Sequence, residues 1–204
     1  MWGLYKVQPS FVLGFHGCDE DVGREVVSGT KRLEPSANEY DWLGSGAYFW
    51  EGSPQRAQEW ADAAHVRHPG VVRKPFVIGA VLDLGLCLNL TDRSALEEVA
   101  GAFEFFKTAI LAEGGQLPVN KGAAPDKPLR YLDKAVFEVL HQIRHETQIK
   151  GGRTLPSYDT VRAPFFEGEV LYPGAAIQSK NHIQIAVRNL KCVKGYFLPI
   201  RESS

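Results

Sequence analysis

The chain has 204 residues, of which 44% are hydrophobic and 23% are charged, a composition typical of a globular domain that buries a sizeable core. Its 23 basic and 24 acidic residues give a net charge of -1, which excludes the strong overall basic charge of many nucleic-acid-binding proteins. Cys18, Cys87 and Cys192 are too few and too widely spaced for a disulfide framework or a Cys-x-x-Cys metal motif. Without an apolar run of signal-peptide or membrane-helix length, the sequence predicts a soluble, cytoplasmic protein with one domain over 1–204.

The N-terminal part is expected to alternate between strand and helix. The apolar run SFVLGFH, residues 10–16, predicts a strand, and the acidic start of the next segment predicts a helix over 19–28. Proline, glycines and polar residues over 30–46 are typical of a loop. The aromatic segment AYFW, residues 47–50, then predicts a short strand.

A second helix should begin at Pro54, because Ser53 suits the N-cap and proline suits the first helical position. We expect this helix to end near Val66. The apolar run FVIGAVLD, residues 76–83, is bounded by a proline and a glycine and predicts a buried strand.

The C-terminal half is expected to contain two helices, a long loop between them and two closing strands. In chain order these are a helix capped by Asp92 or Ser94 and ending near Glu113, a loop over 114–128, an amphipathic helix within 129–146, and strands at 182–188 and 192–198. Because strands and helices do not alternate regularly, the sequence predicts an α+β fold rather than a doubly wound α/β fold.

The first candidate site residue is His16, at the end of the first predicted strand. Alternation places it on the same face as Gly14, and Gly17 follows it directly. That face therefore carries little side-chain volume, which leaves room for a ligand against the backbone. A histidine that is hydrogen-bonded to a loop at a strand end is the commoner structural explanation.

The second candidate is the segment GSGAYFWE, residues 44–51. Gly44 and Gly46 allow tight turns and a close approach of the backbone to a ligand. Tyr48 has a flat face and a polar tip, so it can stack on an aromatic ligand. Glu51 fits either a contact with the first turn of the next helix or a role as a catalytic acid. A cluster of core aromatic residues is the structural alternative.

The third candidate is the strand NHIQIAV, residues 181–187. Alternation places His182 and Gln184 on one face and apolar residues on the other. A half-exposed sheet explains such a pattern. A polar face without charges is also typical of the lining of a cleft.

Several common catalytic and metal-binding motifs are absent from the sequence. It contains no Walker A motif, no G-x-G-x-x-G and no G-x-S-x-G. His141 and His145 are four residues apart on a predicted helix, but the segment lacks the glutamate of H-E-x-x-H and has no obvious third ligand. We therefore expect no metal site.

Three segments in order resemble the NAD-binding core of the ADP-ribosyltransferase superfamily: FHG at 15–17, GSGAYFWEGSPQRAQEWA at 44–61, and VIGAVLDLG at 77–85, followed by a closing strand. The resemblance is to the branch that includes diphtheria toxin and the poly(ADP-ribose) polymerases, and it covers about two thirds of the chain. It implies an α+β fold whose core is a split antiparallel sheet flanked by helices.

The resemblance implies that four residues bind NAD. His16 would hydrogen-bond a ribose of the dinucleotide, and the backbone of Gly17 would hold the nicotinamide amide. Tyr48 would stack on the nicotinamide ring. Trp60, in the following helix, lies within about one residue of the family's second stacking aromatic.

The sequence departs from the family at the third catalytic position, where the family has a glutamate at the start of its last catalytic strand. His182 occupies this place, Gln184 lies two residues further on, and the strand carries no acid. Glu51 could supply a carboxylate instead, as could Glu167 or Glu169 in the preceding segment FFEGEV. The sequence alone does not rank these residues.

The resemblance implies a mono-ADP-ribosyltransferase that uses NAD as substrate, needs no metal, and transfers ADP-ribose to a protein or nucleic acid with release of nicotinamide. A small cytoplasmic chain of this kind fits a bacterial toxin or defence effector, with an antitoxin protein as a further partner and no membrane. The loop from about Tyr158 to Ser179 would contact the macromolecular acceptor. The expected catalytic residues are His16, Tyr48, His182, Gln184 and Glu51.

Other functions of the same chain stay open. An NAD glycohydrolase would use the same site with water as the acceptor. A catalytically inactive module that binds ADP-ribose, nucleic acid or a protein partner is favoured by the missing glutamate. A relative of the RNA 2′-phosphotransferases would need basic residues facing the cleft, and the sequence shows no such cluster.

Overall fold

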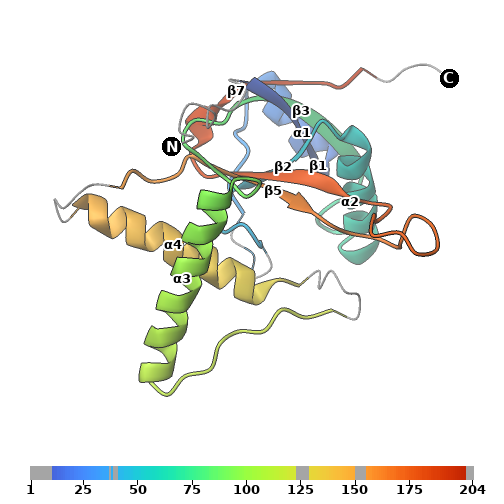
Figure 1. The fold of residues 1–204 in the computed structure, drawn as a ribbon. Coiled ribbons are helices and arrows are strands. Elements are labelled where there is room, and N and C mark those ends of the chain that lie inside the picture. Colours follow the sequence, from blue (N-terminus) through green and yellow to red (C-terminus); the bar gives the residue numbers. More distant parts are fainter. Residues whose placement is uncertain (1–10, 37, 39–40, 123–128, 150–154, 201–204) are drawn as a thin grey trace.

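The computed structural model of the chain describes residues 11–36, 38, 41–122, 129–149 and 155–200. It is an α+β fold in which helices flank a seven-stranded mixed sheet (Figure 1). In chain order the elements are β1 (Phe11–Asp19), α1 (Glu20–Ser28), β2 (Ala47–Glu51), α2 (Pro54–Arg67), β3 (Pro75–Asp83), β4 (Cys87–Asn89), α3 (Arg93–Ala112), α4 (Tyr131–Ile149), β5 (Thr160–Phe165), β6 (His182–Val187) and β7 (Val193–Phe197).

The sheet has the strand order β4-β5-β6-β2-β1-β3-β7, with β4 parallel to β5 and the other neighbours antiparallel. β1 pairs with β3 along its whole length. Its pairing with β2, in contrast, is confined to Gly14 opposite Glu51 and Phe15 opposite Trp50. The sheet therefore divides between β1 and β2 into two parts that share a short junction.

The helices cover both faces of the sheet. α1 packs through Val26 against a cluster that contains Ile78, while α3 and α4 pack on the opposite face, where Phe137 of α4 meets Val161 of β5. α2 lies on the same face as α3 and α4, and its Ala57 packs over the β1–β2 junction. Figure 1 shows α3 and α4 crossing on the side of the sheet away from α1.

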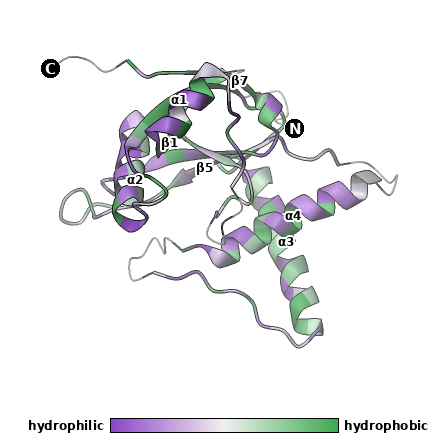
Figure 2. Ribbon diagram, turned by 180° about the vertical axis from the view of Figure 1, so that it is seen from behind, coloured by the Kyte–Doolittle hydropathy of each residue, from purple (hydrophilic) through white to green (hydrophobic). Residues whose placement is uncertain are grey.

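α3 carries hydrophobic side chains that are not buried against the rest of the protein. Figure 2 shows hydrophobic residues along α3 out to its C-terminal end, which projects from the sheet. Of its side chains, only Ala95 and Ala102 are buried, whereas Phe105 and Leu111 are exposed. The N-cap of α3 is Asp92, whose side chain accepts a hydrogen bond from the Ser94 N–H, so Asp92 rather than Ser94 caps this helix.

The first strand is longer than the sequence predicts, because β3 pairs with it as far as Asp19. Asp19 is the N-cap of α1, and its carboxylate also accepts hydrogen bonds from the N–H groups of Arg73 and Lys74. His16 therefore lies inside β1 rather than at its end. Ser53 occupies the N-cap of α2, as predicted, but its side chain makes no capping hydrogen bond.

Two strands, β4 and β5, are missing from the sequence-based prediction. β4 has only three residues, and Pro164 lies within β5, where a proline argues against a strand. β5 is nevertheless central, since it lies between β4 and β6, and its Val161 is fully buried.

Candidate functional site

The gap between β1 and β2 opens directly after their short junction. The Leu13 carbonyl accepts a hydrogen bond from the Gly52 N–H at 2.9 Å, and Phe15 pairs with Trp50. Because backbone groups alternate in direction along an antiparallel strand, the N–H and C=O of Gly17 also face β2. Within the described part of the chain, however, Gly17 has no pairing partner on β2. Its backbone groups therefore face the gap.

Gly17 must be a glycine because of how closely the neighbouring helix packs on it. A Cβ atom built on it would lie 2.3 Å from the carbonyl oxygen of Ala57 and 3.1 Å from the Trp60 ring. α2 consequently approaches β1 so closely that no side chain fits between them.

His16 occupies the gap where the next pair of the β1–β2 ladder would form. Its Nδ1 lies 2.8 Å from the carbonyl oxygen of Tyr48. A carbonyl only accepts, so Nδ1 carries the proton and Nε2 is left as an acceptor. Burial lowers the pKa of His16 by more than the bond to Tyr48 raises it, which keeps the imidazole neutral at pH 7.

Tyr48 is half-buried, and its hydroxyl is fully engaged. The hydroxyl donates to the Gly44 carbonyl at 2.8 Å and accepts from the Leu43 N–H at 2.9 Å. Burial raises the pKa of Tyr48 well above its ordinary value. The ring packs against the cluster beneath α3 and α4. Any contact of Tyr48 with a ligand would therefore be made by its ring.

The glycines beside the aromatic segment also serve the loop itself. Gly44 has φ of 83°, a left-handed conformation that favours glycine. A Cβ atom on Gly46 would lie 3.0 Å from the carbonyl oxygen of Val187 on β6. The Ser45 N–H and hydroxyl both donate to Glu138 of α4 at 2.6 Å. The loop is thus held between β6 and α4.

A continuous row of rings runs from the β1–β2 gap across β2 and β6 to β5. Successive ring centroids lie 5.1 to 6.5 Å apart. We call this set the aromatic row; its members in spatial order are His16, Trp60, Trp50, His182, Phe165 and Trp42. The guanidinium of Arg130 lies over the rings of Phe165 and Trp42, at 4.3 and 4.8 Å from their centroids.

His182 and Gln184 lie on the β6 face that carries the aromatic row, as the alternation predicts. The Nδ1 of His182 lies 2.7 Å from the Lys180 carbonyl oxygen, and burial is the main reason that its pKa is lowered. Gln184 is engaged within the protein, because its Oε1 accepts a hydrogen bond from the Trp42 indole at 2.6 Å.

The structure does not bring Glu51 to the aromatic row. Glu51 alternates with Trp50 along β2 and so faces the other side of the sheet, where it makes a two-point ion pair with Arg162 at 2.6 and 2.9 Å. Glu167 is paired with Arg56 of α2 at 2.6 Å, and Glu169 is exposed. Of the three carboxylates, Glu51 and Glu167 are thus held in ion pairs with arginines.

The structure therefore brings His16, Trp60 and His182 into one row with Trp50 as the link between them. Sequence reasoning missed Trp50 because it assigned the aromatic segment to a stacking tyrosine or to the core. Phe165 was missed together with strand β5. Alternation within AYFW did carry the signal for Trp50, since it places Tyr48 and Trp50 on one face.

Two other features lie outside the β1–β2 gap. An apolar hollow of about 380 Å³ lies between α3 and α4 and is lined by Leu90, Val99, Phe103 and Phe137, together with Trp42, the last member of the row. His141 is buried in α4, and burial together with the charge of Arg188 lowers its pKa to about 3. His145 is exposed.

Comparisons with known proteins supply no relative for this chain: no family model, curated protein or solved structure matches it. Over the residues that the structure describes, no group of three or more histidine, cysteine, aspartate and glutamate side chains is arranged to hold a metal ion. Nor is any described helix long and apolar enough to cross a membrane.

Proposed function

We propose that the chain is an NAD-dependent mono-ADP-ribosyltransferase whose nicotinamide site is the gap between β1 and β2. The observation that carries the proposal is the backbone of Gly17. Its N–H and C=O face the gap beside the aromatic row. A primary carboxamide such as that of nicotinamide both donates and accepts hydrogen bonds, so it is complementary to these two groups.

The surroundings of Gly17 suit the rest of the nucleotide. Trp60 offers a flat surface beside Gly17 and is 39% exposed, and Tyr48 occupies the β2 position that would lie opposite Gly17 if the ladder continued. The free Nε2 of His16 can accept a hydrogen bond from a ribose hydroxyl.

The proposed reaction breaks the bond between nicotinamide and C1′ of the ribose. The bonding electron pair leaves with nicotinamide, and positive charge develops on the sugar. A nucleophile of the acceptor then bonds to C1′ and loses its proton. A neutral His16 places no positive charge beside the sugar as this charge develops, and the lowered pKa keeps the imidazole neutral.

The β5–β6 loop, residues 166–181, is the surface that we assign to the macromolecular acceptor. It projects from the end of the sheet that carries His182 (Figure 1). Its large apolar side chains Phe166, Leu171, Tyr172 and Ile177 are exposed by 50 to 57%. Such exposure is typical of a protein–protein contact.

The test is release of nicotinamide from NAD by the purified protein, with and without cell lysate. Release that needs lysate and leaves label on a macromolecule supports the transferase. Release without any acceptor identifies the NAD glycohydrolase. His16→Ala and Tyr48→Ala should each lower turnover at least 10-fold, about 1.4 kcal/mol of transition-state stabilisation.

A second candidate function is an inactive module that binds ADP-ribose. One observation favours it: Glu51 and Glu167, two of the carboxylates considered for catalysis, are engaged by Arg162 and Arg56. Binding of ADP-ribose without turnover of NAD under any condition would identify this function.

A further inference from the structure

Two neighbouring rings in the middle of the aromatic row each carry a buried polar atom without a partner. The Nε1 of Trp50 and the Nε2 of His182 make no hydrogen bond to any described residue. Trp50 is 5% exposed, and the two ring centroids are 6.3 Å apart. A buried polar atom without a hydrogen bond lowers the stability of the fold, so the presence of two such atoms on neighbouring rings needs an explanation.

The hydrogen-bonding character of the two atoms is opposite and can be assigned. The indole Nε1–H of Trp50 can only donate. The Nδ1 of His182 lies 2.7 Å from the Lys180 carbonyl, which can only accept, so Nδ1 carries the proton. The Nε2 of the neutral ring is then an acceptor. The row thus presents one donor beside one acceptor.

Aromatic rings flank the pair on both sides. Trp60 contacts Trp50 on one side and Phe165 contacts His182 on the other, with centroids 5.9 and 5.3 Å apart. Trp50 and Phe165 are themselves buried in apolar clusters. Hydrogen bonds made in such an apolar setting discriminate strongly between a ligand with the right polar group and one without it.

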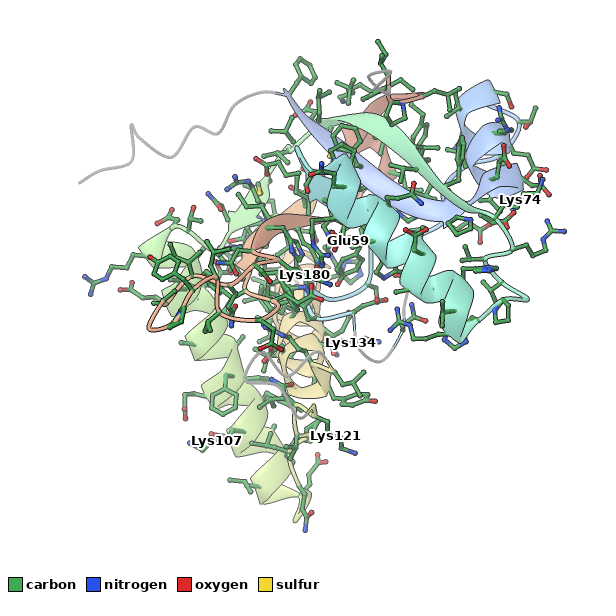
Figure 3. The ribbon with its side chains drawn as sticks, turned by 90° about the vertical axis from the view of Figure 1, so that its right-hand side faces the viewer. Glu59, Lys74, Lys107, Lys121, Lys134 and Lys180 are labelled. Atoms are coloured by element: carbon green, nitrogen blue, oxygen red, sulfur yellow. The ribbon has the colours of Figure 1, made fainter. Side chains whose placement is uncertain are left out.

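Charged residues at the base of the β5–β6 loop and on α2 lie near His182, because the charges of Arg56, Glu167 and Glu59 all act on its pKa. Glu167 at its start is paired with Arg56, Arg56 is also paired with Glu59, and Lys180 at its end lies 3.7 Å from Glu59. Figure 3 shows Glu59 of α2 and Lys180 side by side. These four charged residues, which we call the ionic clasp, join the loop to α2.

We propose that Trp50 and His182 form a donor–acceptor pair that binds a ribose hydroxyl of the ligand. The indole N–H donates to the hydroxyl oxygen, or to one oxygen of a 2′,3′-diol. The Nε2 of His182 accepts the hydroxyl hydrogen. The inference rests on the proposed function for the identity of the ligand, but it concerns residues that bind the sugar rather than nicotinamide.

The test compares binding of nicotinamide mononucleotide, ADP and free nicotinamide by calorimetry in wild type, Trp50→Phe and His182→Phe. Trp50→Phe keeps a ring and removes the N–H. Both variants should bind one of the two nucleotides at least 10-fold more weakly and bind nicotinamide as the wild type does. The nucleotide that is affected identifies which ribose of NAD the pair holds.

A matched pair of variants separates an acceptor from a purely structural histidine. His182→Gln keeps an acceptor oxygen and should retain more nucleotide affinity than His182→Phe when both have wild-type melting temperatures. His145→Ala, an exposed histidine outside the site, should bind all three probes like the wild type.

The results also distinguish this inference from the proposed function. Unchanged nucleotide binding in both Trp50→Phe and His182→Phe would overturn the pair even if the protein turns NAD over. Equal loss of nicotinamide and nucleotide binding would overturn it too, because the sugar would not be the group recognised. Wild-type protein that releases no nicotinamide from NAD, but binds ADP in a manner sensitive to Trp50→Phe, would refute the transferase and support the pair.

Discussion

Gly17 has a packing role and a proposed binding role, and a single substitution tests both. Gly17→Ala would place a Cβ atom 2.3 Å from the Ala57 carbonyl oxygen. Backbone atoms of β1 and α2 must then move apart, so we expect a loss of about 1–3 kcal/mol in the free energy of unfolding. We also expect NAD turnover to fall at least 10-fold, because the backbone groups that face the gap move with β1. Thermal unfolding and nicotinamide release measure the two effects.

Gly101→Ala is the matched control for this substitution. Gly101 is exposed on α3, and a Cβ atom there meets nothing within 4 Å. Alanine should therefore stabilise the helix by about 0.5–1 kcal/mol and leave turnover unchanged. A Gly17→Ala protein as stable and active as this control would refute both roles of Gly17.

Tyr48 combines a loop contact with a proposed stacking contact, and two substitutions separate them. Tyr48→Phe keeps the ring but leaves the Leu43 N–H without its partner, at a cost of about 1–3 kcal/mol in stability. Its KM for NAD should stay within about threefold of the wild type, since stacking needs only the ring. Tyr48→Ala should raise KM at least 10-fold. Denaturant unfolding and steady-state kinetics provide the two readouts.

The elements differ in how well local sequence specifies them. β1, β2 and β3 follow from their apolar or aromatic runs, and α2 follows from Ser53 and Pro54, because each signal is local. β4 and β5 do not follow, since a three-residue strand and a strand containing Pro164 are stabilised mainly by neighbours far away in the sequence.

The candidate site was only partly predictable for the same reason. Alternation correctly placed His182 and Gln184 on one face of β6, whereas the same alternation along β2, which places Tyr48 and Trp50 on one face, was not used. It could not show that Gln184 is engaged by Trp42, because Trp42 is distant in the sequence and lies in a loop. Nor could it show that Glu51 is bound by Arg162 from a strand that was not predicted.

α4 carries a buried base that should make stability depend on pH. The pKa of His141 is lowered from 6.5 to about 3, mainly by burial, so between these values the unfolded chain binds a proton that the folded chain excludes. With respect to His141, the folded state therefore has its full stability above pH 6.5 and loses stability as the pH falls below that value. At pH 5 we expect a loss of about 2 kcal/mol. Urea unfolding at pH 7 and pH 5 measures it.

His141→Gln is the comparison for this effect, since glutamine does not titrate. Its stability should change less between pH 7 and pH 5 than that of the wild type, and His16 and His182, whose pKa values are also lowered by burial, contribute the dependence that remains. The carboxylates of Glu98 and Glu138, whose pKa values are lowered from 4.5, contribute in the same direction only at lower pH. An equal pH dependence in both proteins would assign the effect to groups other than His141.

At the scale of the whole molecule, the proposed reaction needs two surfaces, the β1–β2 gap and the β5–β6 loop. A Leu171→Ser, Tyr172→Ser double variant removes two exposed apolar side chains from the loop without touching the gap. Transfer of label to lysate should fall at least about fivefold, ~1 kcal/mol, because apolar anchors dominate protein contacts. Acceptor-independent release of nicotinamide should be unchanged. Equal loss of both activities would exclude the loop as the acceptor surface.

The short junction between β1 and β2 has a consequence for how the protein responds to its ligand. Each part of the sheet is well paired internally, but among the described residues the β1–β2 ladder has two residue pairs and one further backbone hydrogen bond, from Gly52 to Leu13. A nucleotide bound to Gly17 in one part of the sheet and to Trp50 and His182 in the other would bridge the two parts and restrict their relative motion. Its binding should then slow amide hydrogen exchange in β1 and β6 together, far beyond the atoms that it touches.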